Sequence, residues 1–550
     1  MSDHRAAAPA AIDPQPPRPR LELIPIEARA LRFGNASRLT CALIVVLFAA
    51  LRFWKLTAYG LFSDEVFSAE TAHRSWPQLQ RAVITDVVHP PLFYYLLKLW
   101  IAASDALLWM KLLPVLLAIL AIMPFVLLCR ELKLRPTTIN LALFLMAVNE
   151  YLINYAQELR MYSLLLLLVV TSMWLFAKLT NARTRALAVQ LALLATNLLL
   201  VYTHYYGWLI VAGELLFVMM KRRDRLASFG LSVAMLVASF APWAVAVAEA
   251  AYDKGGLGPN LKWNTRPTVN DFFQHYVTLN GPIYTSWRAY ATIFSSVIFF
   301  TPILLWAWQQ LKKAKGKRQN MAWDALSRAA AKGKNVDCLN LPPDELRDAG
   351  ATDTNILLWL ALLAFLPSVI AFAASYLLAQ SVWGSRFLIV VAPAYLLLVA
   401  VAATRRRPRK LRRLAVATLA AWAALSGALQ LTHRDKINWQ PLVERMIQSE
   451  MNQVSEIPVY TRQGVTGTTI QYYLDQAGEQ RLRLRYLDDY SAIDAPRFWI
   501  AFIRYRHDTG PTPAEGLAAR GDRLGEAVEA DAPGHQVIFI PVEHRAPMKR

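Results

Sequence analysis

Charged residues are scarce in this chain: Asp, Glu, Lys and Arg make up 18% of its 550 residues, and hydrophobic residues make up 55%. Soluble domains contain about a quarter charged residues, so the composition excludes an ordinary soluble protein. Apolar runs of roughly 20 residues, the length that crosses a bilayer as a helix, recur along the chain. Together these features predict a polytopic α-helical membrane protein.

Cysteine is also scarce. The three cysteines, Cys41, Cys129 and Cys338, fit neither the spacing of a zinc site nor that of a redox pair, and no disulfide is expected on the outer side. The chain lacks a Gly-rich nucleotide-binding motif. Its formal net charge of +20 is explained by basic cytoplasmic loops. Because the basic clusters carry no interleaved aromatic residues, no nucleic acid is expected as a partner.

The N-terminus lacks the early apolar core of a cleaved signal peptide, so residues 1–38 are predicted to form a cytoplasmic tail. Residues 39–431 are predicted to form the membrane domain, with about 11 transmembrane helices. They are expected at 39–56, 105–128, 137–156, 161–177, 186–203, 206–220, 226–247, 288–310, 354–379, 387–403 and 413–431. With the N-terminus inside, this order puts the basic loop clusters in the cytoplasm, as the positive-inside rule requires. We therefore expect a multi-pass protein of the inner (plasma) membrane.

Two further segments complete the predicted architecture. The apolar segment 91–103 is short for a span, and a crossing there would place the later basic loops outside. We expect it to form an interfacial or re-entrant helix in the first outer loop. Beyond residue 431 the apolar runs end, and short β-rich runs follow at 457–462, 497–503 and 536–542. They predict a small extracytoplasmic α/β domain over residues 432–550.

The predicted topology gathers the unusual polar residues on the outer side, where charges at the hydrocarbon boundary often mark a pathway or a reaction site. Asp64 and Glu65 follow the first span, and a carboxylate at the membrane edge can act as a general base. A helix cap formed by Ser63 or Asp64 is an equally good explanation. His89 precedes two prolines that preset a helix start, where a phosphate is favoured, although this histidine can also serve only as a cap.

Glu158, Arg160 and Tyr162 lie between two predicted spans. Glu158 and Tyr162 share a face if the segment is helical. Arg160 can bind a phosphate through its planar fork of donors, or it can pair with Glu158 or extend to the interface. Arg386, which directly precedes a span, is a second candidate phosphate ligand with the same alternative.

Three other outer residues are candidate supports: Asp86, His204 and Tyr205. An aromatic belt at the interface would explain Tyr205, and a lone histidine there is often structural. A metal role for His204 would need a carboxylate from another loop, such as Asp86 or Glu158. The sequence leaves a divalent metal open.

These residues carry a resemblance to a known family. The run Asp64-Glu65, Asp86, His89-Pro90-Pro91-Leu92 and Tyr94-Tyr95, followed by Gln157-Glu158 and Arg160-Met161-Tyr162, resembles the glycosyltransferase family 39-like proteins. These are GT-C-fold membrane enzymes related to protein O-mannosyltransferases and to the lipid A aminoarabinose transferase. The similarity covers mainly residues 39–230. It implies inverting sugar transfer, on the outer face, from a polyprenyl phosphate or diphosphate carrier to a glycan, lipid or protein acceptor.

The resemblance also implies roles for individual residues. Asp64 matches the first-loop aspartate taken as the catalytic base, and Glu158 matches the acidic position of the second outer loop. His89 stands where the aminoarabinose enzymes have a lysine linked to the donor phosphate, so that phosphate binding here would depend on pH. Those enzymes have an acidic residue directly before that lysine, whereas Val88 stands there in this chain and Asp86 lies three residues upstream of His89. This difference weakens any transfer of their metal site.

The sequence therefore predicts a GT-C membrane glycosyltransferase with catalytic Asp64, Glu65 and Glu158. Its donor phosphate is expected on His89, Arg160 and Arg386, and its acceptor or supporting contacts on Asp86, Tyr162, His204 and Tyr205. The main alternative is a lipid or solute transporter or flippase, which should show inverted repeats and ionisable residues near mid-span. A non-catalytic envelope assembly protein is a third possibility.

Overall fold

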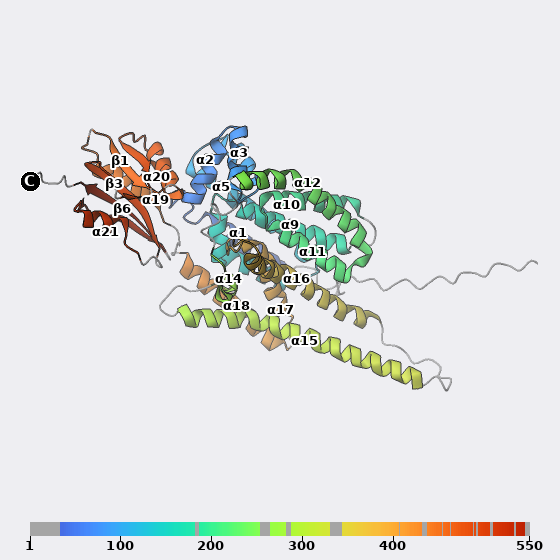
Figure 1. Cartoon of the computed structure of the whole chain (residues 1–550). Coiled ribbons are helices and arrows are strands. Elements are labelled where there is room, and N and C mark those ends of the chain that lie inside the picture. Colours follow the sequence, from blue (N-terminus) through green and yellow to red (C-terminus); the bar gives the residue numbers. More distant parts are fainter. Residues whose placement is uncertain are drawn as a thin grey trace, which may run out of the picture.

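The structure is a computed structural model. It describes residues 34–181, 186–253, 265–281, 288–330, 344–405, 408–431, 437–453, 455–462, 464–487, 489–490, 493–505, 510–532 and 535–544. Most of the predicted N-terminal tail and Cys338 lie outside these residues. Cys41 and Cys129 are free thiols. A long helical bundle occupies most of the chain, and a sheet domain formed by the C-terminal residues lies at one end of it (Figure 1).

Among the described residues, seven segments are long and apolar enough to cross a membrane: Asn35–Phe53, Leu107–Glu131, Tyr162–Asn181, Arg223–Asp253, Ala289–Lys312, Asn355–Leu377 and Phe387–Thr404. An eighth is added if α7 (Pro136–Val148) and α8 (Glu150–Ala156), bent by 61°, form one broken span. A multi-pass membrane protein is thereby confirmed. The predicted number of about 11 is not. The predicted spans at 186–203 and 206–220 form α10 (Leu187–Thr203) and α11 (Gly207–Lys221), which are short for a membrane span. The predicted span at 413–431 lies in α18 (Arg409–Gln430), which is long enough but is not among the helices apolar enough to cross a membrane.

The position of a helix in the bundle depends on how much of its circumference is apolar and buried. Helix α17 (Ala392–Thr404) is apolar on every side and fully buried, so it occupies the centre of the bundle. It packs against α7, α16 (Asp344–Leu377) and α15 (Arg288–Ala330). By contrast, α1 (Asn35–Phe53) and α12 (Leu226–Asp253) bury only a minor part of their surfaces and have apolar faces on the outside. Helices α5 (Leu107–Leu120) and α6 (Ile122–Glu131) together make up the candidate span Leu107–Glu131, and α9 (Tyr162–Asn181) forms another.

Three short helices follow α1 before the next span: α2 (Ser63–His73), α3 (Trp76–Asp86) and α4 (Leu92–Ile101). Helix α4 corresponds to the segment 91–103 that was predicted to form a helix of the first outer loop. It has only 10 residues, which is too short to span a bilayer. Helices α2 and α4 pack against each other, and a further short helix, α14 (Val269–Leu279), follows α12.

The C-terminal residues form the predicted α/β domain around one sheet with the strand order β2-β1-β3-β6-β4. The strands are β1 (Ile457–Thr461), β2 (Leu482–Tyr486), β3 (Arg497–Tyr505), β4 (Arg523–Leu524), β5 (Val528–Ala532) and β6 (His535–Glu543), with β5 paired to β6. Strand β1 is parallel to β2 and β3, whereas β6 runs antiparallel to β3. Helices α19 (Trp439–Ser449), α20 (Val465–Gln476) and α21 (Pro513–Arg520) cover the sheet.

The C-terminal domain contacts the segment that leads into α2. The Tyr473 hydroxyl donates a hydrogen bond to the Leu61 carbonyl (2.7 Å), and the Gly60 N–H donates to Asn438 Oδ1 (3.4 Å). A Cβ atom at position 60 would lie 2.2 Å from the Tyr473 hydroxyl oxygen, so this approach requires glycine. The domain therefore helps to place the start of α2, where Asp64 and Glu65 lie.

Candidate active site

Glu65 connects the start of α2 to the break between α8 and α9. Its carboxylate is buried and accepts two backbone hydrogen bonds, from the N–H of Phe62 (3.0 Å) and from the N–H of Leu159 (2.7 Å). Residues 157–161 form this break, so Glu158 and Tyr162 do not lie on one continuous helix as the sequence spacing had suggested. Both oxygens of Glu65 are thus used to hold two loops together.

Arg160 lies at the centre of the site and is 4% exposed. Its Nη1 donates to the Asp64 carbonyl (3.1 Å), to Ser68 Oγ (3.0 Å) and to the Tyr94 hydroxyl (3.4 Å). Its Nη2 lies 3.4 Å from His89 Nδ1. Burial lowers the pKa of this guanidinium, but nearby negative groups, Asp64 among them, outweigh burial and raise it above the ordinary value. Arg160 is therefore a permanent cation that links α2, α4 and the loop before α4.

Asp64 faces a second arginine from a distant part of the chain. Arg386 Nη1 donates to Asp64 Oδ2 at 2.6 Å, and both side chains are 28% exposed. The arginine is placed through its backbone, since the Tyr151 hydroxyl donates to the carbonyls of Ser385 (2.7 Å) and Arg386 (3.3 Å). A carboxylate and a guanidinium thus meet at a place where both groups are partly exposed.

Two histidines stand beside the arginines. The rings of His89 and His204 are 5.3 Å apart, and each also contacts the ring of Phe387. Both are buried, and neither Nε2 atom has a hydrogen-bond partner among the described residues. Burial, reinforced by Arg160 and Arg386, lowers the pKa of His204 to about 3 and holds the pKa of His89 well below its usual value. Both imidazoles are therefore neutral at pH 7.

The turn before His89 has an unusual backbone. Val87 has φ of 57°, a conformation that is rare for a β-branched residue. The Tyr205 hydroxyl donates to the Val87 carbonyl (3.3 Å) and accepts from the Trp243 indole N–H (3.3 Å). Tyr205 therefore supports the loop that presents His89 to the site, and such strain is often found where a loop must be aimed.

The other predicted residues lie around this core. Glu158 is buried and acts electrostatically on Tyr151, Tyr155 and Tyr162. The Tyr162 hydroxyl is buried without a hydrogen-bond partner among the described residues. Asp86 acts electrostatically on Arg160 and on Tyr205. The described residues contain no group of three or more His, Cys, Asp or Glu side chains arranged to hold a metal ion.

Three contributors were missed by the sequence analysis: Ser68, Tyr94 and Tyr151. Ser68 lies one helical turn after Asp64, so its spacing contained a usable signal. Tyr94 was noted only as part of the motif, and its hydroxyl contact with Arg160 depends on the packing of α4. The Tyr151 hydroxyl donates hydrogen bonds to the carbonyls of Ser385 and Arg386, which are more than 230 positions away in the sequence, and no local pattern indicates that contact.

The site thus combines one water-accessible carboxylate, two arginines and two neutral imidazoles at the ends of several helices. Arg160 and Arg386 can neutralise a bound phosphate through charge-assisted hydrogen bonds. Asp64 can accept a proton from a hydroxyl that approaches from the aqueous side. The His89 and His204 Nε2 atoms can donate or accept a single hydrogen bond each.

Comparisons with known proteins bear on the fold. No protein-family model and no curated protein match the chain. Among solved structures, ArnT from Cupriavidus metallidurans in the apo state aligns with 91% of this chain and 97% of that chain, at 13% identity and a TM-score of 0.50. The same protein bound to undecaprenyl phosphate aligns over the same shares, at 12% identity and a TM-score of 0.46. The chain therefore has the GT-C fold of ArnT, with apolar membrane-spanning helices and a small C-terminal sheet domain, as the motif resemblance had predicted.

Proposed function

We propose that the protein is a membrane glycosyltransferase that moves a sugar from a polyprenyl phosphate carrier to an acceptor hydroxyl or amine, on the outer face and with inversion. The observation that carries this proposal is the Asp64–Arg386 pair beside Arg160, which places a carboxylate that can serve as a base next to two cations that can bind a phosphate. The GT-C fold shared with ArnT supports it, and ArnT itself binds undecaprenyl phosphate, a ligand of this chemical class.

The ion pair suggests how donor binding prepares the base. In the free protein Arg386 is occupied by the Asp64 carboxylate at 2.6 Å. A donor phosphate competes for the same guanidinium, and Arg160 adds a second cation close by. Binding of the phosphate would therefore release Asp64 toward the acceptor. The free protein holds its base in an ion pair, and the substrate makes that base available.

The transfer step follows from these positions. Asp64 takes the proton from the acceptor, whose oxygen or nitrogen attacks the anomeric carbon from the face opposite the phosphate. The bond between that carbon and the phosphate oxygen breaks, and polyprenyl phosphate leaves with the electron pair. Arg160 and Arg386 stabilise the negative charge that develops on the phosphate. Single attack accounts for the inversion, and the positioned base contributes about 10²–10⁴-fold.

The remaining residues have supporting roles in this proposal. Glu65 holds the two loops that carry Asp64 and Arg160, so it positions the base rather than acting on the substrate. His89 donates one neutral N–H to the phosphate, and His204 packs against it. Glu158 and Asp86 orient the acceptor or a cation, with Tyr162 and Tyr205 beside them. The site and the C-terminal domain would then face the outside of the inner membrane.

The test is transfer by the purified full-length protein in detergent. Labelled polyprenyl phosphate sugars are supplied one at a time with a membrane glycolipid and glycan extract, with and without a chelator. Transfer from at least one donor, giving a product of inverted anomeric configuration, is expected. The chelator arm decides whether a divalent metal takes part. No transfer from any donor, combined with movement of labelled lipid across proteoliposome membranes, would favour a transporter instead.

A further inference from the structure

The C-terminal sheet has a topological switch point. Strand β1 lies between two parallel neighbours, β2 on one side and β3 on the other. Helix α20, which connects β1 to β2, packs with α19 on one face of the sheet. The connection from β2 to β3 instead contributes Tyr490 and Ile493 to the opposite face. In open α/β sheets, ligands bind at such a point, outside the carboxyl ends of the strands.

A cavity occurs at this place. It has a volume of about 590 Å³, within the range of small-ligand sites. Thr461 and Arg462 line it from the end of β1, and Arg504 and Tyr505 line it from the end of β3. Thr466 and Thr512, at the starts of α20 and α21, complete its polar wall. The cavity therefore coincides with the position that the topology favours for a ligand.

The charge of the cavity indicates the ligand's sign. Its described lining residues include two arginines and no carboxylate. Neither the Arg462 nor the Arg504 side chain forms a hydrogen bond or an ion pair with another described residue, and both residues are exposed. Other arginines of this domain do have partners: Arg481 pairs with Glu479, and Arg497 with Glu450. Two guanidinium groups that face one cavity and have no partner among the described residues are suited to a phosphate or a carboxylate.

We infer that this cavity binds a saccharide that carries a phosphate or a carboxylate group. Arg462 and Arg504 hold the anionic group, and the N-terminal turns of α20 and α21 add favourable partial charge. The threonine hydroxyls can exchange hydrogen bonds with sugar hydroxyls. Tyr505, which is 45% exposed and whose ring contacts that of His535, offers an apolar face to a pyranose ring. This site is separate from the candidate active site, and its binding can be measured without any transfer reaction.

The experiment is calorimetric titration of the full-length protein in detergent with four ligands: glucose 1-phosphate, glucuronate, glucose and inorganic phosphate. The test variant is Arg462→Gln/Arg504→Gln. The matched control is Arg483→Gln/Arg523→Gln, which removes two exposed arginines of the same sheet that do not line the cavity. Both variants change only exposed residues, and their thermal unfolding is recorded alongside.

We expect one of the two anionic sugars to bind, glucose to bind at least about 10-fold more weakly, and the test variant to lose about 10–100-fold in affinity, as expected when charged hydrogen bonds are removed. The control variant should bind like the wild type. Equal affinity in the test and control variants, or no binding of either anionic sugar, would overturn the inference. Inorganic phosphate that binds as tightly as glucose 1-phosphate would overturn the role of the sugar ring.

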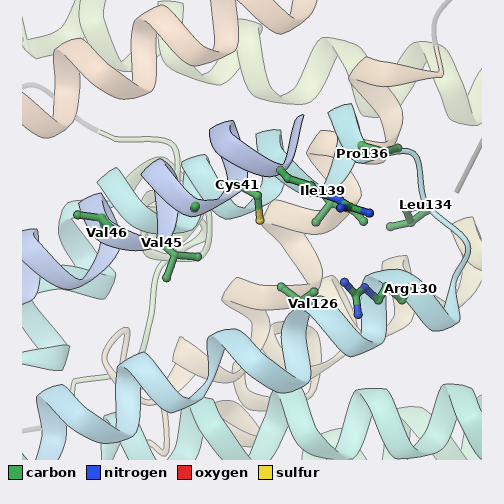
Figure 2. A pocket seen from close by; sticks show the side chains of 10 residues that line it. Cys41, Val45, Val46, Val126, Arg130, Leu134, Pro136 and Ile139 are labelled. Atoms are coloured by element: carbon green, nitrogen blue, oxygen red, sulfur yellow. The ribbon is translucent and has the colours of Figure 1, made fainter. Parts of the chain in front are cut away.

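A second cavity carries an independent inference. A groove of about 870 Å³ lies between α1, α6 and α7. Figure 2 shows Val45, Val46, Val126 and Ile139 along it, with Arg130 toward one end. Arg38 also lines the groove, 14 residues before Arg52 on α1, which corresponds to about 21 Å along the helix. Gln157, in the break that carries Arg160, donates to the Arg52 carbonyl (2.9 Å). The Arg38 end of the groove is therefore distant from the candidate active site.

We further infer that this groove holds an anionic phospholipid. Its walls are apolar side chains of membrane-spanning helices, which suit acyl chains, and its described lining includes two arginines and no carboxylate. Basic pockets between transmembrane helices bind anionic head groups in this way. Neither arginine side chain forms a hydrogen bond or ion pair with another described residue. A zwitterionic lipid would leave this positive charge unmatched.

Native mass spectrometry of the full-length protein with phosphatidylglycerol and phosphatidylethanolamine tests this. Arg38→Gln/Arg130→Gln should lose one bound phosphatidylglycerol and about 10-fold in its affinity. The control variant Arg412→Gln/Arg413→Gln should keep both the bound lipid and the affinity. Its arginines lie at the start of α18, near the same end of the bundle, because α18 follows α17 and Thr404 of α17 is hydrogen-bonded to Thr138 of α7. Bound phosphatidylglycerol should also slow alkylation of Cys41, which lines the groove. Equal lipid binding by both variants, or unprotected Cys41, would refute the site.

Discussion

Removing the charge of Glu65 should lower the stability of the protein, whereas removing the charge of its neighbour Asp64 should lower sugar transfer and leave stability nearly unchanged. In Glu65→Gln, one amide oxygen can still accept one of the two backbone N–H groups, those of Phe62 and Leu159. The other N–H then faces an amide donor and remains unsatisfied, at a cost of about 1–3 kcal/mol. The remaining hydrogen bond also loses its charge assistance, about 1 kcal/mol more. The free energy of unfolding should therefore fall by about 2–4 kcal/mol.

Asp64→Asn should leave stability nearly unchanged. Its ion pair with Arg386 is partly open to water, so its removal should cost no more than about 1 kcal/mol. The assay compares the apparent melting temperatures of the two variants in one detergent, together with their transfer rates at a temperature where both are folded. Glu65→Gln should melt several degrees lower and keep part of its transfer activity, whereas Asp64→Asn should melt like the wild type. A Glu65→Gln protein with wild-type stability would refute the structural role of Glu65.

Three other predictions follow from the same geometry. Arg386→Gln should weaken binding of polyprenyl phosphate by about 10–100-fold, since one charged hydrogen bond to the phosphate is lost; wild-type affinity, measured by titration, would remove Arg386 from the donor site. The pKa of His204 is about 3 in the folded protein and about 6.5 when unfolded, so the unfolded state binds more protons between these values and stability falls as the pH drops. The loss should reach about 3 kcal/mol at pH 4.5, and His204→Asn should remove it from a series of melting curves. Arg52→Leu should destabilise the protein by about 3 kcal/mol, because its buried guanidinium donates to the carbonyls of Met146 (2.9 Å) and Ala147 (2.8 Å) at the end of α7; an unchanged melting temperature would contradict this.

Hydrophobicity was sufficient to predict the class of fold. Long apolar runs, the short segment 91–103 and the β-rich runs after residue 431 each correspond to an element of the structure. The number of spans was harder to predict, because a window of apolar residues does not reveal where a helix breaks. At Asn149 the chain bends by 61°, and the Asn149 side chain caps the new helix by accepting from the Leu152 N–H (3.2 Å).

Part of the candidate site could also be predicted from the sequence, on the basis of charge rather than hydrophobicity. Charges such as Asp64, Arg160 and Arg386 stand out against an apolar sequence, and the structure brings all three together. What the sequence could not separate was the division of labour between Asp64 and Glu65. The two are neighbours in sequence, yet the Glu65 carboxylate is buried and accepts hydrogen bonds from two backbone N–H groups, whereas the Asp64 side chain is 28% exposed and pairs with an arginine. That difference depends on two distant contacts, of Glu65 with Leu159 and of Asp64 with Arg386, 94 and 322 positions away in the sequence, which no local pattern encodes.

The central claim is that Asp64 is the general base, and the most direct measurement is the single-turnover rate of sugar transfer by Asp64→Asn with donor affinity determined in parallel. The account predicts a rate about 10²–10⁴-fold below that of the wild type, with donor binding equal or tighter, because Asp64 no longer competes for Arg386. An Asp64→Asn protein that binds donor normally and transfers at more than about a tenth of the wild-type rate would contradict it.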